Sequence, residues 1–112
     1  MIEKIKELLL KYDAEYDEHY GYYIFPTTYE TNGALLWFFQ EQTVQIAETV
    51  YLQNYDTISY AGVTSYELSQ QNLLDIIEKQ LNILHKQFFE SLKEIKKHQM
   101  KIKIKSANSD FK

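Results

Sequence analysis

The sequence predicts an α+β fold, a four-stranded antiparallel β-meander with an N-terminal helix and a long C-terminal helix. Three observations predict it. Apolar residues near the N-terminus recur at helical spacing, residues 20–61 contain four short strand-like segments separated by turn signals, and residues 65–100 hold a helical stripe without Gly or Pro. The 112 residues suit one domain, which we place at 1–105 with a flexible tail at 106–112.

The first helix is predicted over residues 2–16. Its apolar face is marked at spacings of three and four residues by Ile2, Ile5, Leu9, Tyr12 and Tyr16. The acidic residues that follow blur its end.

Four strands are predicted, over residues 20–25, 34–39, 43–52 and 57–61. Pro26 ends the first, Asn32 and Gly33 form a turn signal before the second, and Gly62 ends the fourth. The short connections favour antiparallel pairing of consecutive strands.

The long helix is predicted to begin at a capping box formed by Thr64 and Glu67. It carries an apolar stripe made of Leu74, Ile77, Leu81, Leu84, Phe88, Leu92 and Ile95. At 1.5 Å per residue the helix is about 54 Å long, whereas a six-residue strand covers about 20 Å. The helix therefore either breaks near residues 87–91 or packs its far half on something else. One such partner is a second copy, in a homodimer built on Leu84, Phe88, Leu92 and Ile95.

The charges are unevenly distributed along the chain. Residues 1–60 hold ten acids and three Lys, whereas residues 61–112 hold six acids and nine Lys. The basic run near the C-terminus consists of Lys93, Lys96, Lys97, Lys101, Lys103 and Lys105. Lys there favours a helix dipole or protects a strand edge, and the alternative is weak nucleic-acid binding. The absence of Arg disfavours specific nucleic-acid recognition.

Catalytic and metal-binding patterns are incomplete. Asp13, Glu15 and Asp17 have the spacing that opens a calcium loop, but Glu18 stands where Gly is needed and Ile24 where Glu is needed. Three scattered His and no Cys make a zinc site improbable. We therefore expect no metal, no cofactor and no enzymatic activity.

Two single residues have alternative interpretations. Glu48 lies among apolar residues of a strand face, so it is either buried and reactive or turned outward by a bulge. His85 borders the helix stripe, and we interpret it as lining the core.

Aromatic residues are the strongest functional signal. The strand at 34–39 is apolar on both faces, while helices in an α+β fold cover only one. The second face must be covered by the long helix, by another copy or by a partner protein. The predicted partner-binding residues are Tyr22, Tyr23, Trp37 and Phe39, together with the acidic Asp13, Glu15, Asp17 and Glu18.

These features predict a small non-enzymatic protein-binding module whose partner the sequence does not identify. Small bacterial and phage inhibitors, such as immunity and anti-defence proteins, share this acidic, Tyr-rich profile and act by covering a partner's surface. Lys without Arg and abundant Ile, Asn and Tyr suggest a low-GC bacterium or its mobile elements. The lack of Cys and of a long apolar run favours a cytoplasmic protein without a membrane segment. The structural homo-oligomer remains the alternative.

Overall fold

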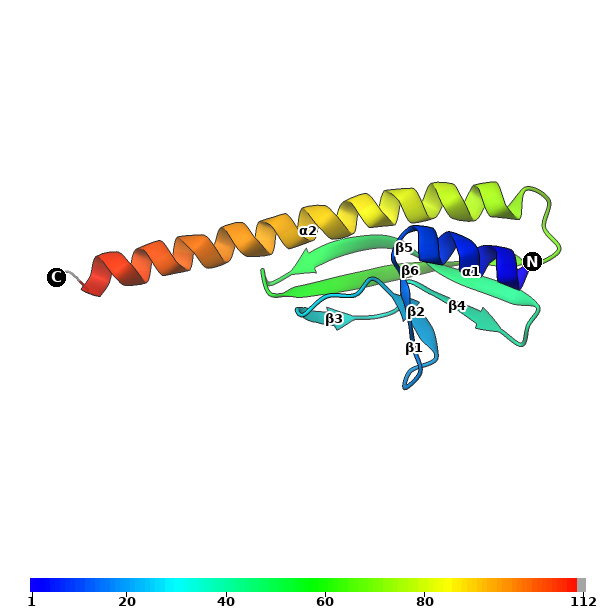
Figure 1. Cartoon of the computed structure of the whole chain (residues 1–112), viewed down its shortest axis with the longest axis horizontal. Coiled ribbons are helices and arrows are strands. Elements are labelled where there is room, and N and C mark those ends of the chain that lie inside the picture. The colour runs from blue at the N-terminus through cyan, green and yellow to red at the C-terminus, as the bar shows by residue number, and fades with distance from the viewer. Residues whose placement is uncertain (111–112) are drawn as a thin grey trace.

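The computed structural model describes the backbone of residues 1–110 and the side chains of residues 1–101. Two helices lie on one side of a curled sheet, and the second helix projects far beyond it (Figure 1). The elements are, in chain order, α1 (Ile2–Lys11), β1 (Glu15–Asp17), β2 (Tyr22–Ile24), β3 (Glu30–Asn32), β4 (Leu36–Phe39), β5 (Thr43–Gln53), β6 (Thr57–Glu67) and α2 (Leu73–Asp110). The predicted α+β class and both terminal helices are confirmed.

The predicted four-stranded antiparallel meander is only partly right. The sheet has six strands in the order β1-β2-β4-β5-β6-β3, and β3 runs parallel to β6. The extra strand β1 lies in the acidic segment at the end of the predicted first helix, and β3 lies between the first two predicted strands, where no strand was predicted. Both are three residues long. Tertiary pairing, rather than hydrophobic alternation, makes such short segments into strands.

The first helix ends five residues earlier than predicted. Asp13 adopts a left-handed backbone conformation with a φ of 60°. The N–H of Asp13 donates to the carbonyl of Leu10, and that of Ala14 donates to the carbonyl of Leu9 at 2.9 Å. This is the hydrogen-bond pattern of a Schellman motif, which closes a helix. Ala14 is 5% exposed and joins the core.

The hairpin of β5 and β6 is longer than predicted. Each strand has eleven residues, and the pairing runs from Thr43 opposite Glu67 to Gln53 opposite Thr57. The predicted capping box is therefore wrong, since Thr64 and Glu67 are strand residues. Pairing with β5 satisfies the backbone of the whole segment, whereas a cap satisfies only a few groups. Gly62 does not end the strand and lies within it.

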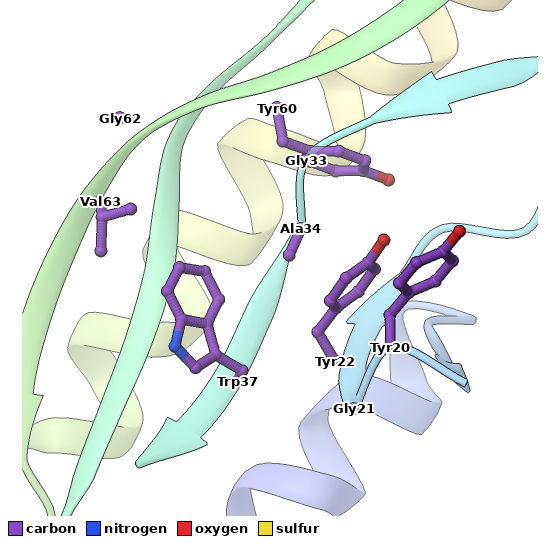
Figure 2. Close-up of a pocket in the computed structure, with 9 residues that line it drawn as sticks. All are labelled: Tyr20, Gly21, Tyr22, Gly33, Ala34, Trp37, Tyr60, Gly62 and Val63. Carbon is purple, nitrogen blue, oxygen red and sulfur yellow. The ribbon is translucent and has the colours of Figure 1, made fainter. Parts of the chain in front are cut away.

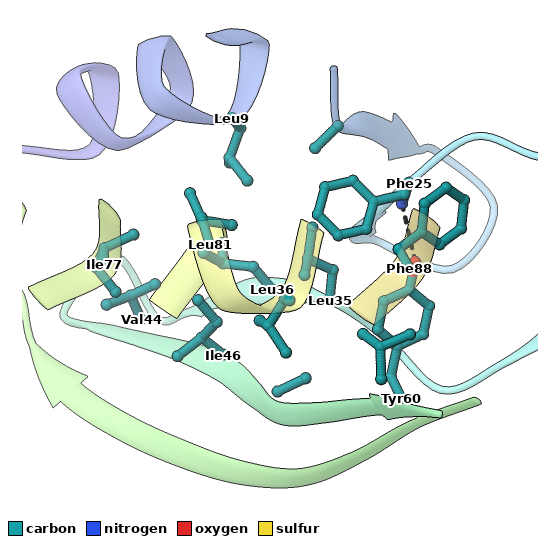
Figure 3. Close-up of a cluster of buried hydrophobic side chains, with 14 of the residues drawn as sticks. Leu9, Phe25, Leu35, Leu36, Val44, Ile46, Tyr60, Ile77, Leu81 and Phe88 are labelled. Carbon is teal, nitrogen blue, oxygen red and sulfur yellow. Dashed lines mark hydrogen bonds between the residues drawn. The ribbon is translucent and has the colours of Figure 1, made fainter. Parts of the chain in front are cut away.

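Helix α2 is continuous from Leu73 to Asp110, which excludes the alternative of a break near residues 87–91. Its buried side chains face the sheet and α1, as Figure 3 shows for Ile77, Leu81 and Phe88. At 3.3 Å per residue β5 reaches about 36 Å, and α2 reaches about 57 Å. The ring of His98 stacks on Tyr55 at the hairpin tip, with centroids 4.7 Å apart. The rest of α2 projects beyond that tip (Figure 1).

The flexible tail predicted at 106–112 falls largely within α2, which runs to residue 110, and residues 111–112 lie outside the described part. Its flexibility stays a prediction. Among the described residues no helix combines the length and apolar character needed to cross a bilayer.

Candidate protein-binding groove

A groove of about 450 Å³ opens on the sheet face opposite the helices. We call it the outer groove. Figure 2 shows the residues that line it, which are Tyr20, Gly21, Tyr22, Gly33, Ala34, Trp37, Tyr60, Gly62 and Val63. Period-two alternation along β4 positions Trp37, because Leu36 is buried toward the helices and its neighbour must point the other way. Trp37 is the single Trp of the chain and is half-buried.

All three glycines of the chain line this groove. Gly21, Gly33 and Gly62 have φ values of 76°, 84° and 71°, which favour glycine over other residues. A methyl group on Gly33 would lie 2.7 Å from the carbonyl oxygen of Tyr60, and one on Gly62 would lie 2.6 Å from Oε2 of Glu48. The backbone that lines the groove therefore depends on glycine at two close contacts.

Tyr20 and Tyr22 form one wall of the outer groove. Their rings stack with centroids 5.5 Å apart and an interplanar angle of 13°. The turn that connects β1 to β2 is held by Asp17, whose Oδ1 accepts hydrogen bonds from the backbone N–H groups of His19 and Tyr20, at 3.0 and 3.2 Å. Tyr20 is 65% exposed. A large aromatic surface is thus fixed in place while it remains open to solvent.

The charges nearest the groove are carboxylates. Partial burial raises the pKa of Tyr22, and the carboxylate of Asp17 raises it further. Glu48 packs over Gly62 and hydrogen-bonds with Thr64 Oγ1 at 3.2 Å. Burial raises the pKa of Tyr60 to about 12, although its hydrogen bond from Phe25 N–H opposes the shift. The groove offers aromatic surface and negative charge, without a cluster of acid–base groups.

The structure separates the predicted aromatic site. Tyr22 and Trp37 line the outer groove, and Phe39 lies on the same face of β4 with 51% of its surface exposed. Tyr23 points to the other face, where its ring contacts Tyr16 and Phe38. Consecutive residues of a strand point to opposite faces, so the separation of Tyr22 from Tyr23 could have been predicted from the sequence.

The predicted acidic residues are also divided. Asp13 closes α1, and Asp17 holds the turn beside Tyr20, while Glu15 and Glu18 are exposed.

Within residues 1–101 no three His, Asp or Glu side chains converge in a way that could hold a metal ion. Glu48 is exposed, as expected for the outward alternative, although its strand keeps a constant register with β6.

The residues predicted to form an oligomer helix already contact the sheet of their own chain. Leu84, Phe88 and Ile95 are at most 4% exposed, and Leu92 is half-buried. A dimer built on them stays a prediction. His85 lies at the border of the core, where its ring meets those of Tyr12, Phe25 and Phe89.

The sequence interpretation missed Tyr20, Ala34 and Val63 as groove residues, as well as the glycines. The available signal was the scarcity of glycine, with three in 112 residues, one of them between Tyr20 and Tyr22. The convergence of the glycines required the tertiary structure.

The fold and groove together define an α+β protein with an aromatic sheet face. A scan against models of known protein families finds no match, and neither a search of curated proteins nor a search of solved structures finds a similar chain.

Proposed function

We propose that this protein is a non-enzymatic binding module that engages a partner protein through the outer groove. The single observation that carries the proposal is a preformed aromatic surface, made by Tyr20, Tyr22 and Trp37, on a sheet face that no helix of residues 1–110 covers. Tyr and Trp supply large contact area at low entropic cost and dominate binding hot spots. Rigid support from the turn at Asp17 and from the glycines lowers the cost of ordering this surface on binding.

A protein surface suits the groove better than a small metabolite does. Pockets for small ligands carry a few converging polar groups that fix the ligand's orientation. The side chains around the outer groove are mainly rings, Ala and Val, with phenol hydroxyls as their main polar groups. Inhibition by covering a partner's surface, in the manner of immunity or anti-defence proteins, needs shape and charge rather than chemistry. We propose this mode of action.

Affinity capture tests the proposal. The protein is immobilised and exposed to an extract of its native host, and we expect one stoichiometric partner. Trp37→Ala and Tyr22→Ala should each abolish capture, because each removes a ring from the groove. Phe89→Ala is the matched control, since Phe89 is 47% exposed but lies on α2. Equal capture by all variants would contradict binding through the groove.

A homo-oligomer is the second candidate, and the projecting end of α2 favours it. Beyond His98 the helix runs past the sheet, and Met100 there is 63% exposed. Association of two such ends would bury surface that the monomer leaves open. Light scattering at tens of micromolar distinguishes the candidates, because a monomeric mass excludes this one.

A further inference from the structure

The charges of the chain are segregated between the sheet and the helices. From Tyr12 to Glu78 the sequence contains no Lys or Arg, and this stretch includes all six strands. Between residues 12 and 72 there are nine carboxylates, on Asp13, Glu15, Asp17, Glu18, Glu30, Glu41, Glu48, Asp56 and Glu67. Eleven of the twelve Lys fall in α1 and α2, and Lys112 lies outside the described residues. The strands therefore carry carboxylates and no Lys or Arg side chain.

The fold places the Lys-bearing helices and the outer groove on opposite sides of the sheet (Figures 1 and 2). A partner that approaches the groove meets carboxylates without compensating side-chain cations from the strands. Like charges repel and opposite charges steer association, so this side favours a cationic partner and disfavours an anionic one.

Two of the carboxylates lie beside residues that line the groove. Asp17 is close enough to Tyr22 to raise the pKa of its phenol, and Glu48 packs against Gly62 on the opposite wall. The aromatic rings between them add a second attraction. Guanidinium and ammonium groups bind the faces of Trp and Tyr rings, because the ring quadrupole presents negative charge there. Figure 2 shows the rings of Trp37, Tyr20 and Tyr22 around the opening.

We infer that the outer groove receives a Lys- or Arg-bearing segment of the partner protein. The cationic side chain packs against the rings of Trp37, Tyr20 and Tyr22, and its charge is balanced by Asp17 and Glu48. This inference rests on the proposed function and adds the chemistry of the partner. The proposed occupant is a segment of another protein. A second copy of this chain is the alternative occupant, because α2 contains a run of Lys near its end, and the measurements below distinguish the two.

Trp37 gives a direct readout, because it is the single Trp and lines the groove. The intact protein is titrated with octalysine and octaarginine while Trp emission is followed, with octaglutamate as the negative probe. We expect a saturable emission change with both cationic probes and none with octaglutamate. Absence of saturable binding by either cationic probe at 50 mM salt overturns the inference.

Matched charge variants distinguish the effect of the carboxylates beside the groove from the effect of the protein's net charge. The double variant Asp17→Asn and Glu48→Gln keeps an oxygen acceptor at each position, so the turn at Asp17 can still form. It should weaken octalysine binding roughly fivefold to tenfold, as expected for losing two nearby charges. The control, Glu7→Gln with Glu90→Gln, removes the same net charge from exposed helix positions and should weaken binding less than twofold. Equal weakening in both variants overturns a site at the groove.

Two further measurements complete the test. Tyr22→Leu retains apolar bulk but removes the ring, and it should also weaken binding, whereas unchanged affinity contradicts packing of the cation on the ring.

Light scattering of the wild type shows whether the chain associates with itself. Association that the Asp17→Asn and Glu48→Gln variant abolishes would place a second copy in the groove and overturn an external segment. Capture of a partner that Trp37→Ala abolishes but the charge variant leaves intact would preserve the proposed function and reject the cationic segment.

Discussion

The backbone N–H of Phe25 donates a hydrogen bond to the phenol oxygen of Tyr60, 3.0 Å away and 35 positions later in the chain. Phe25 follows β2 and Tyr60 lies in β6, so this buried bond joins segments on opposite sides of β4 and β5 in the sheet order. The two rings also pack together, with Phe88 of α2 against Phe25 (Figure 3). The phenol therefore connects the outer groove, which Tyr60 lines, to the hydrophobic core.

Tyr60→Phe should lower the free energy of unfolding at pH 7 by about 1–2 kcal/mol, because Phe25 N–H loses its acceptor in a buried position. Urea unfolding followed by circular dichroism measures the change. Tyr51→Phe is a suitable control, since Tyr51 is 45% exposed. An unchanged midpoint for Tyr60→Phe would contradict a stabilising role for this bond.

Stability should also fall at high pH because of Tyr60. Burial raises the pKa of the phenol from 10.0 in the unfolded chain to about 12 in the fold, so the folded state favours the neutral form. The stabilisation is complete below pH 10 and is lost as the pH rises through 12. Two pKa units correspond to roughly 3 kcal/mol. Unfolding measured from pH 9 to 12 should show a steeper loss in the wild type than in Tyr60→Phe, whereas parallel curves would contradict the assignment.

Substitution of the three glycines by Ala should destabilise the fold to different extents. Each position has a positive φ, which costs a residue with a Cβ about 1–2 kcal/mol. Gly21→Ala should show this cost alone, since its methyl would meet nothing closer than 3.8 Å. Gly62→Ala adds a clash with Glu48, whose carboxylate can move but whose Cβ, 2.9 Å from the new methyl group, is fixed to the backbone. Gly33→Ala adds a clash at 2.7 Å with the backbone carbonyl oxygen of Tyr60, which is also fixed. Thermal unfolding should therefore rank Gly21→Ala as the least damaging, with Gly33→Ala and Gly62→Ala both more damaging.

Two Gln side chains of α2 hydrogen-bond with the backbone of β5 where β4 no longer covers it. Gln80 Nε2 donates to the carbonyls of Ala47 and Glu48, and Gln87 Oε1 accepts from Val50 N–H at 2.8 Å. Gln87→Leu should cost roughly 1–2 kcal/mol and accelerate amide exchange at Val50. Gln99→Leu, at an exposed position of the same helix, is the control. Unchanged exchange at Val50 would contradict this role.

The projecting end of α2 should be dispensable for folding. A chain ended after Lys101 should unfold within a few degrees of the full chain, because the contact of His98 with Tyr55 is retained. Ile95→Ala, at a position 1% exposed, should instead cost about 2–4 kcal/mol. Calorimetry compares the two. A large loss on truncation would show that residues beyond Lys101 stabilise the fold, either within one chain or between copies.

Local patterns in the sequence determined the elements that have a strong period. The apolar stripe of α2 predicted a helix and the pattern of residues 43–52 predicted a strand, because these periods follow from backbone geometry alone. The absence of Cys and the uneven charges could also be read directly. Comparing element lengths also indicated that the long helix exceeds the strands, but it left open whether the helix breaks or continues beyond the sheet.

The tertiary structure alone decided where these elements begin and what they enclose. Thr64 and Glu67 fit a helix cap by local preference, yet pairing with β5 makes them strand residues. β1 and β3 are too short to have a recognisable period, and only their neighbours hold them in the sheet. The outer groove likewise joins Gly21, Gly33 and Gly62, which are distant in sequence. Short-range preferences amount to fractions of a kcal/mol per residue, so cooperative pairing and burial override them.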